Sequence, residues 1–150
     1  MLMRMSESPS RTTAVPAHLG WRLLALVYDV VISITFLFVV SALSLALKPD
    51  HRPVEPGTPA ALLVFIALWA VIGAYAVLSW RRGGQTIGMK PWRLQVVTAE
   101  GNRPSWRALM IRYAVTSLSL GMSLLWCLFD GQRRGLHDLA AGTLLVRRQT

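Results

Sequence analysis

The chain alternates between long apolar runs and short connections rich in arginine, proline and glycine. Apolar runs cover residues 23–47, 60–80 and about 111–129, and 18 or more consecutive apolar residues are typical of a membrane-spanning helix. As a helix the first run would rise about 37 Å, which is enough to cross a hydrocarbon core of about 30 Å. The pattern therefore predicts an all-α membrane protein with three apolar segments, of which the third is the shortest.

The polar connections predict little regular structure beyond two short strands. Residues 1–20 form a polar tail that is expected to be disordered up to about Pro16, and the transmembrane domain is expected to cover residues 21–148. Residues 48–59 contain four prolines and indicate a stiff loop between the first two helices. Residues 92–98 and 142–148 are strand candidates, and a sheet of two such strands would need support from the helices.

The third apolar segment leaves two topologies open. The N-terminal tail, the connection 81–112 and the C-terminal tail are rich in arginine, which marks the cytoplasmic side, whereas the loop 48–59 is nearly neutral. Three crossings would place the C-terminal tail outside, in conflict with its charge. A re-entrant segment that bends within 117–123 would remove the conflict and bring the two strands to one side. The length of the segment favours one crossing.

The net charge of +9 fits a membrane surface better than nucleic acid. Basic residues flank the apolar runs, as expected for contact with anionic lipid headgroups of a bacterial inner membrane. We therefore expect a cytoplasmic N-terminus and no nucleic-acid partner. The single cysteine, Cys127, allows no disulfide within the chain, and the three histidines show no metal-ligand pattern. Because no catalytic motif is present, neither an enzyme nor a cofactor is expected.

Asp29 is the only charged residue between positions 23 and 47. A carboxylate at that depth costs about 2.5–3.5 kcal/mol on insertion scales, so it is usually paired and usually functional. Arg22 lies two helical turns earlier and its side chain leans away from Asp29, so we expect no direct contact. Arg112 is the preferred partner and Arg107 the next, while Ser33 extends the polar face. The alternative is that Asp29 only locks helices together.

Several short motifs follow one another in a fixed order. They are Arg22 and Asp29 in the first run, Gly84-Gln85-Thr86-Ile87-Gly88-Met89-Lys90 after the second, Arg93-Leu94-Gln95-Val96-Val97, and Gly135-Leu136-His137-Asp138-Leu139-Ala140-Ala141-Gly142-Thr143. From about residue 21 to 148, this order resembles the RDD family of small membrane proteins, named for one arginine and two aspartates. The resemblance implies that Arg22, Asp29 and Asp138 are the named positions, and it suggests transport of ions or unidentified ligands. Met89 stands where the family often has a basic residue.

We therefore expect a transport-related membrane protein in which Asp29 is a protonatable or cation-binding group. The alternative is a structural or accessory protein whose polar residues lock helix packing and contact lipid headgroups. Three helices enclose little space, so transport would require a homo-oligomer or partner membrane subunits. Asp138 lies among many cations, and we predict that it ties the C-terminal tail to the basic connection through Arg81, Arg82 or Arg93.

Overall fold

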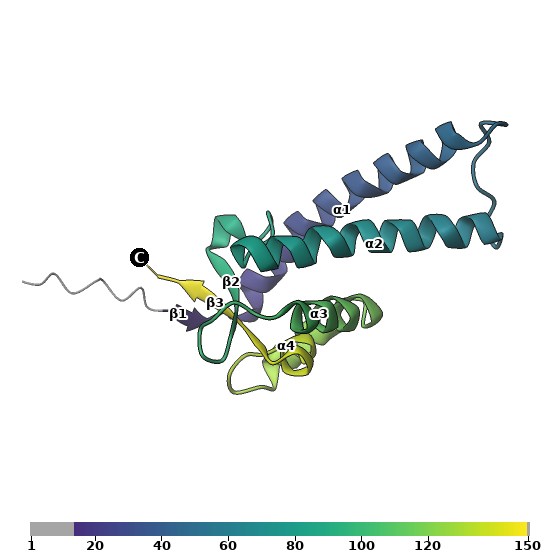
Figure 1. The fold of residues 1–150 in the computed structure, drawn as a ribbon. Helices are drawn as coiled ribbons and strands as arrows, with labels where there is room; N and C mark the ends of the chain where they lie inside the picture. Colours follow the sequence, from purple (N-terminus) through teal and green to yellow (C-terminus); the bar gives the residue numbers. More distant parts are fainter. Residues whose placement is uncertain (1–13, 150) are drawn as a thin grey trace, which may run out of the picture.

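Two long helices lead away from a small sheet and shorter helices that gather at one end of the molecule (Figure 1). The computed structural model describes residues 14–149. In chain order the elements are β1 (Ala14–Pro16), α1 (Leu19–Leu47), α2 (Pro59–Gly83), the 3₁₀ helix η1 (Lys90–Trp92), β2 (Leu94–Thr98), α3 (Trp106–Leu118), the 3₁₀ helix η2 (Met122–Leu128), α4 (Leu136–Ala141) and β3 (Thr143–Arg148).

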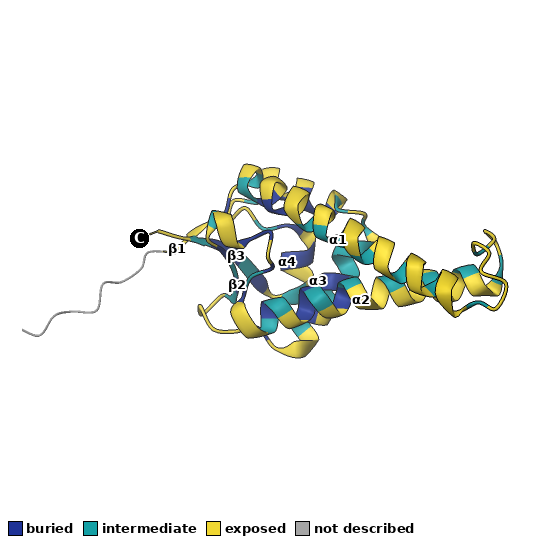
Figure 2. Ribbon diagram, turned by 90° about the horizontal axis from the view of Figure 1, so that it is seen from above, coloured by how far each residue is buried: buried dark blue, intermediate teal, exposed yellow. Residues whose placement is uncertain are grey.

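Helices α1 and α2 are the first two predicted spans, and both are long and apolar enough to cross a membrane. Large apolar side chains such as Val31, Phe38 and Leu63 are exposed along them. Figure 2 shows that their outer halves are mainly exposed, while the buried residues gather at the sheet end. Such an apolar surface is expected where lipid rather than water surrounds a helix.

Local signals fix the ends of α2. Thr58 caps the first turn, since its hydroxyl oxygen accepts a hydrogen bond from Ala61 N at 3.2 Å, and Pro59 occupies the first turn. The helix stops at Gly84, whose φ of +69° is left-handed and whose N–H donates to the Trp80 carbonyl at 2.9 Å. This stop turns the chain back toward α1, where the functional site lies.

The three strands form an antiparallel sheet in the order β1-β3-β2. The two predicted strands pair with each other, with Val96 opposite Leu145, which confirms that part of the sequence analysis. β1 was not predicted. Residues 14–16 pair with β3, so the expectation of disorder was wrong for them, because the free edge of β3 satisfies their backbone groups. The rest of the expected tail, residues 1–13, lies outside the described residues.

The third apolar segment is bent rather than straight. α3 and η2 meet at an angle of 100°, and the backbone turns at Leu120 and Gly121, where φ is +49° and +82°. Since α1 and α2 lead away from the sheet and back, β1 and β2 lie on one side of the membrane. β3 pairs with both strands, so it lies on that side too. The expectation of three crossings was therefore wrong, and the re-entrant alternative describes the fold.

Cysteine labelling tests this topology. In a Cys127→Ser background, we expect Asn102→Cys and Gln149→Cys to react with an impermeant thiol reagent from the same face of the membrane. Thr58→Cys, in the loop between α1 and α2, should react from the opposite face. Labelling of Gln149→Cys together with Thr58→Cys would show that the third segment crosses.

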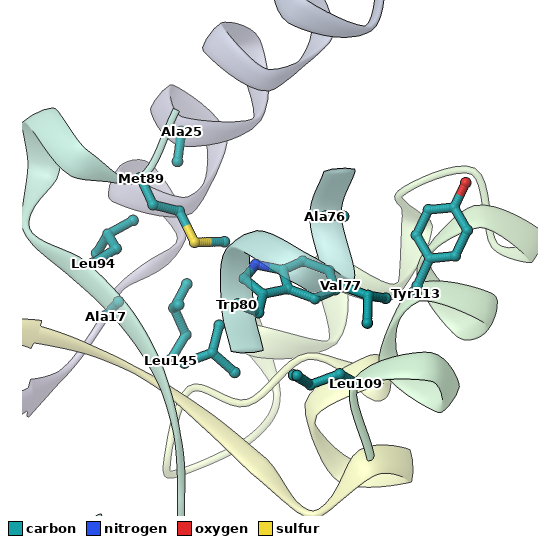
Figure 3. Packing of buried hydrophobic residues seen from close by; sticks show 11 residues of the cluster. Ala17, Ala25, Ala76, Val77, Trp80, Met89, Leu94, Leu109, Tyr113 and Leu145 are labelled. Carbon is teal, nitrogen blue, oxygen red and sulfur yellow. The ribbon is translucent and has the colours of Figure 1, made fainter. Parts of the chain in front are cut away.

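A compact apolar core joins α2 to the sheet. Leu94, Leu109 and Leu145 are almost completely buried, at 0%, 0% and 3% exposure. Figure 3 shows the Trp80 indole with Leu94, Leu145 and Met89 on one side and Leu109 on the other. Burying a side chain of this size stabilises the fold by about 1.5–3 kcal/mol. This core holds the end of α2 and the loop after it in one position relative to α1.

Candidate functional site

Asp138 lies at the start of α4 and is completely buried. Its Oδ2 atom accepts a hydrogen bond from Gly135 N at 3.0 Å, so the carboxylate caps the first turn of its own helix. The backbone around Gly135 leaves no room for a side chain, because a Cβ there would lie 2.5 Å from a ring carbon of His137. The sequence Gly-Leu-His-Asp thus aims the carboxylate into the protein.

Two guanidinium groups hold the Asp138 carboxylate from two other helices. Arg22 Nη1 of α1 lies 2.6 Å from Oδ2, and Arg112 Nη1 of α3 donates to Oδ1. All three side chains are at most 3% exposed. Arg22 also donates to the carbonyls of Ala17 at 3.1 Å and Arg133 at 2.8 Å. The cluster Arg22–Asp138–Arg112 therefore joins α1, α3 and α4 with the entry to the sheet.

The charges of this cluster are set by its neighbours. Burial alone would raise the pKa of Asp138, but the guanidiniums of Arg112 and Arg22 outweigh it and hold the pKa well below its usual range. Burial and the charge of Arg112 lower the pKa of His137 to about 3, so His137 is neutral at physiological pH. Its Nδ1 atom shares a hydrogen bond of 2.9 Å with Ser123. Two arginines and one aspartate leave the cluster with one net positive charge.

Asp29 occupies a different place and has different partners. It lies on α1, half-buried, and accepts hydrogen bonds from Tyr75 Oη at 3.1 Å, Thr86 Oγ1 at 2.5 Å and Gly88 N at 3.1 Å. All three donors are neutral, and no basic side chain among residues 14–149 forms an ion pair with this carboxylate. An ionised carboxylate has about four acceptor sites, so one site, on Oδ2, stays open.

The loop after α2 supplies two of the three donors to Asp29. Gly88 approaches α1 so closely that a Cβ would lie 2.5 Å from the Ala25 carbonyl oxygen and 2.7 Å from Asp29 Cγ. Only glycine allows that approach. Tyr75 fixes the loop in turn, because its hydroxyl accepts a hydrogen bond from Ile87 N at 2.9 Å. The motif Gly84–Gly88 therefore forms a cradle for the Asp29 carboxylate, with one backbone donor, Gly88 N, and one side-chain donor, Thr86 Oγ1.

A cavity of about 180 Å³ lies between the two carboxylate sites. Asp29 and Ser33 line it from α1, Tyr75 and Trp80 from α2, and Arg112 from α3. Most of the remaining wall is apolar and includes Leu26, Val30, Ile72, Leu124 and Leu145. An apolar cavity of about 150 Å³ is large enough to bind benzene, so this one has room for a small organic ligand.

The structure corrects the expected ion pairs. Arg112 binds Asp138 and not Asp29, because α3 packs beside α4 at the sheet end. Arg107 is exposed on α3, and Ser33 bonds the Asp29 backbone carbonyl at 2.8 Å. Arg22 forms its ion pair with Asp138, and Asp29 takes its hydrogen bonds from other residues, in line with the expectation that these two do not pair.

The expected tie between Asp138 and the basic connection was also wrong in its partners. The salt bridges of Asp138 run to Arg22 and Arg112 rather than to Arg81, Arg82 or Arg93. The carboxylate lies inside the protein, where it caps α4, and within the connection 81–112 it is the last residue, Arg112, that binds it. Asp138 instead ties the C-terminal part of the chain to α1 through Arg22 and to α3 through Arg112.

The donors to Asp29 were not predicted from the sequence. Tyr75 is the only phenol in the second apolar run, and Thr86 and Gly88 belong to a motif that was noticed without a partner. A polar motif directly after a spanning helix, together with a carboxylate in the preceding helix, is the signal that could have joined them.

Comparison with known proteins agrees with this geometry. Residues 16–142 match the model of the RDD family. The chain belongs to this family. With two apolar helices of spanning length and a re-entrant pair, it is an integral membrane protein.

Among curated proteins, the chain resembles an uncharacterized protein of Rickettsia prowazekii, with 28% identity over 87 residues. That match covers 57% of this chain and 50% of the relative, so the chain spans about half the length of the curated relative it matches. No solved structure matches the chain. In this RDD protein the arginine Arg22 and the second aspartate Asp138 contact each other, and the first aspartate Asp29 stands apart.

Proposed function

We propose that this RDD protein is transport-related, and that Asp29 binds an ion or the cationic group of a small ligand within the membrane. The observation that supports the proposal is the unbalanced charge of Asp29. Three neutral donors orient the carboxylate, no cation among the described residues neutralises it, and it lines a cavity. A charge of this kind is costly in a membrane and is usually retained for binding.

The alternative function, a lock for helix packing, describes Asp138 better than Asp29. Asp138 is fully buried, its charge is neutralised by two arginines, and a backbone N–H also donates to it. Asp29 has only neutral donors, Tyr75, Thr86 and Gly88, and these could serve an uncharged amide equally well. The two aspartates of the family are therefore proposed to have separate tasks, folding for Asp138 and ligand binding for Asp29.

The proposal includes an orientation and partners. Basic residues gather at the sheet end of the molecule, among them Arg81, Arg82, Lys90, Arg147 and Arg148. This distribution supports a cytoplasmic sheet and N-terminus in an inner membrane, with the loop 48–59 outside. Two crossing helices and one re-entrant segment enclose little space, so we include self-association or partner membrane subunits in the proposal.

Reconstitution tests the proposed function. Purified protein in vesicles should take up radioactive sodium or radioactive leucine, or move protons detected by an entrapped dye, faster than protein-free vesicles. Asp29→Asn should reduce each such flux to the level of protein-free vesicles, because the amide keeps the hydrogen bonds and loses the charge. Asp50→Asn, in the exposed loop after α1, is the control and should behave as the parent.

Two outcomes would contradict the proposal. One is that none of the three probes moves faster than in protein-free vesicles. The other is a flux that Asp29→Asn carries as well as the parent, which would leave Asp29 with a packing role.

A further inference from the structure

Two residues in the wall of the cavity have hydrogen-bond donors that lack acceptors. Arg112 Nε and Trp80 Nε1 are buried without a hydrogen-bond partner, and both residues line the cavity. They are 2% and 7% exposed. Figure 3 shows the indole nitrogen of Trp80 directed toward Met89 and Ala25, two further residues of the cavity wall.

Unpaired donors at this position are expensive and point to an acceptor. A buried N–H without a partner costs about 1–3 kcal/mol, and native proteins keep few of them. Because the Arg112 guanidinium also lies 5.2 Å from the Trp80 ring centroid, the two donors are close neighbours. The cluster of Arg22, Arg112 and Asp138 carries one net positive charge beside them. An anionic acceptor such as a carboxylate suits this end.

The other end of the cavity suits a cation. Asp29 carries a negative charge that no described residue neutralises, and its Oδ2 has an acceptor site left. Asp29 and Arg22 are seven residues apart on α1, which separates their backbone positions by about 10.5 Å along the helix. The wall between the two ends is apolar, with Leu26 and Ile72 among its residues.

From these two ends we propose that the cavity binds a small zwitterion, an amino acid whose carboxylate meets Arg112 and Trp80 and whose ammonium group meets Asp29. This inference rests on the proposed function and specifies its substrate class. A lone cation would leave both donors without acceptors, and a lone anion would leave Asp29 without a counter-charge. A zwitterion satisfies both ends at once and adds no net charge to the membrane. The cavity volume and its apolar wall leave room for a short apolar side chain.

Ligand binding to the purified parent in detergent tests the zwitterion directly. Leucine and γ-aminobutyrate provide two spacings of the opposite charges, while isoamylamine and isocaproate each keep only one charge of leucine. At least one zwitterion should bind about tenfold or more tightly than either single-charge analogue, since each charged hydrogen bond contributes about a factor of ten. The readout is the ligand concentration that raises the unfolding midpoint halfway to saturation.

Two tryptophan variants locate the carboxylate end. Trp80→Phe keeps a ring in the core and removes the unpaired donor, so it should weaken zwitterion binding about tenfold and leave isoamylamine binding unchanged. Trp92→Phe is the matched control. The Trp92 indole N–H is also buried without a partner, but Trp92 does not line the cavity, so this variant should bind as the parent does.

The outcomes separate this inference from the proposed function. If isoamylamine binds as tightly as leucine and γ-aminobutyrate, and Asp29→Asn abolishes that binding, the zwitterion is wrong and the cation site at Asp29 stands. If no probe binds and Asp29→Asn keeps the parent's flux in vesicles, both proposals fail. Equal loss of binding in Trp80→Phe and Trp92→Phe would also overturn the assignment of the carboxylate end.

Discussion

Asp138→Asn is expected to lower the free energy of unfolding by about 3–5 kcal/mol, because it leaves two buried guanidiniums without their counter-charge. Arg22 and Arg112 are both almost completely buried and both bind this one carboxylate. An amide has a single acceptor oxygen and cannot serve both arginines and Gly135 N. For a chain of this length the change corresponds to roughly 6–20 °C in the unfolding midpoint.

Thermal unfolding of purified protein in detergent measures this effect. Asp50→Asn is the control, because Asp50 is exposed and has only weak partners, Lys48 at 3.6 Å and Arg52 N at 3.3 Å. Its midpoint should match that of the parent. If Asp138→Asn unfolds at the parent's midpoint as well, the buried cluster does not hold α1, α3 and α4 together.

Gly88→Ala is expected to disrupt the cradle around Asp29 and to destabilise the fold by about 1–3 kcal/mol, the usual cost of overpacking. The added Cβ would lie 2.5 Å from the Ala25 carbonyl oxygen and 2.7 Å from Asp29 Cγ, and neither atom belongs to a flexible chain end. The loop has to move away from α1, and Asp29 then loses its bonds from Gly88 N and Thr86. Because the carboxylate is then no longer held in place, the flux in vesicles should fall as well.

The control for this variant is Gly83→Ala, five residues earlier in the chain. A Cβ at Gly83 meets no atom within 4 Å, and the residue ends α2, where alanine is tolerated. Gly83→Ala should therefore keep the parent's midpoint and flux. An unchanged midpoint and flux in Gly88→Ala would mean that the loop is not held against α1 as the structure shows.

Much of the fold follows from patterns that are local in the sequence. The two long apolar runs gave α1 and α2, and the residues of β2 and β3 showed strand character. Ala14–Pro16 showed no strand character, because this segment has only three residues and contains a proline. It becomes strand β1 by pairing with the edge of β3. The path of the third segment depends on that sheet as well. Pairing between distant strands is a tertiary property that the sequence pattern does not show. The length of the third apolar segment alone therefore favoured a third crossing, which was wrong.

In the site, too, some features are visible in the sequence and others depend on the tertiary structure. Asp29 and Asp138 could be located in the sequence, since a lone intramembrane charge and a Leu-His-Asp motif are visible without a structure. Their partners could not be assigned, because Arg22 and Asp138 are 116 positions apart and which faces of the helices meet is decided by packing. An arginine has the opposite charge, and one at a similar depth in the membrane was a reasonable partner to expect for Asp29. The structure instead gives Asp29 two hydroxyl donors and one backbone N–H.

The central claim is that the two aspartates have separate tasks, and one paired measurement tests it most directly. Asp29→Asn and Asp138→Asn are purified in parallel, and the unfolding midpoint and the flux per folded protein are measured on the same preparations. The account predicts that Asp29→Asn keeps the parent's midpoint and loses its flux, while Asp138→Asn unfolds at a much lower temperature. If Asp29→Asn loses as much stability as Asp138→Asn and keeps its flux per folded protein, Asp29 is a second lock and the account is contradicted.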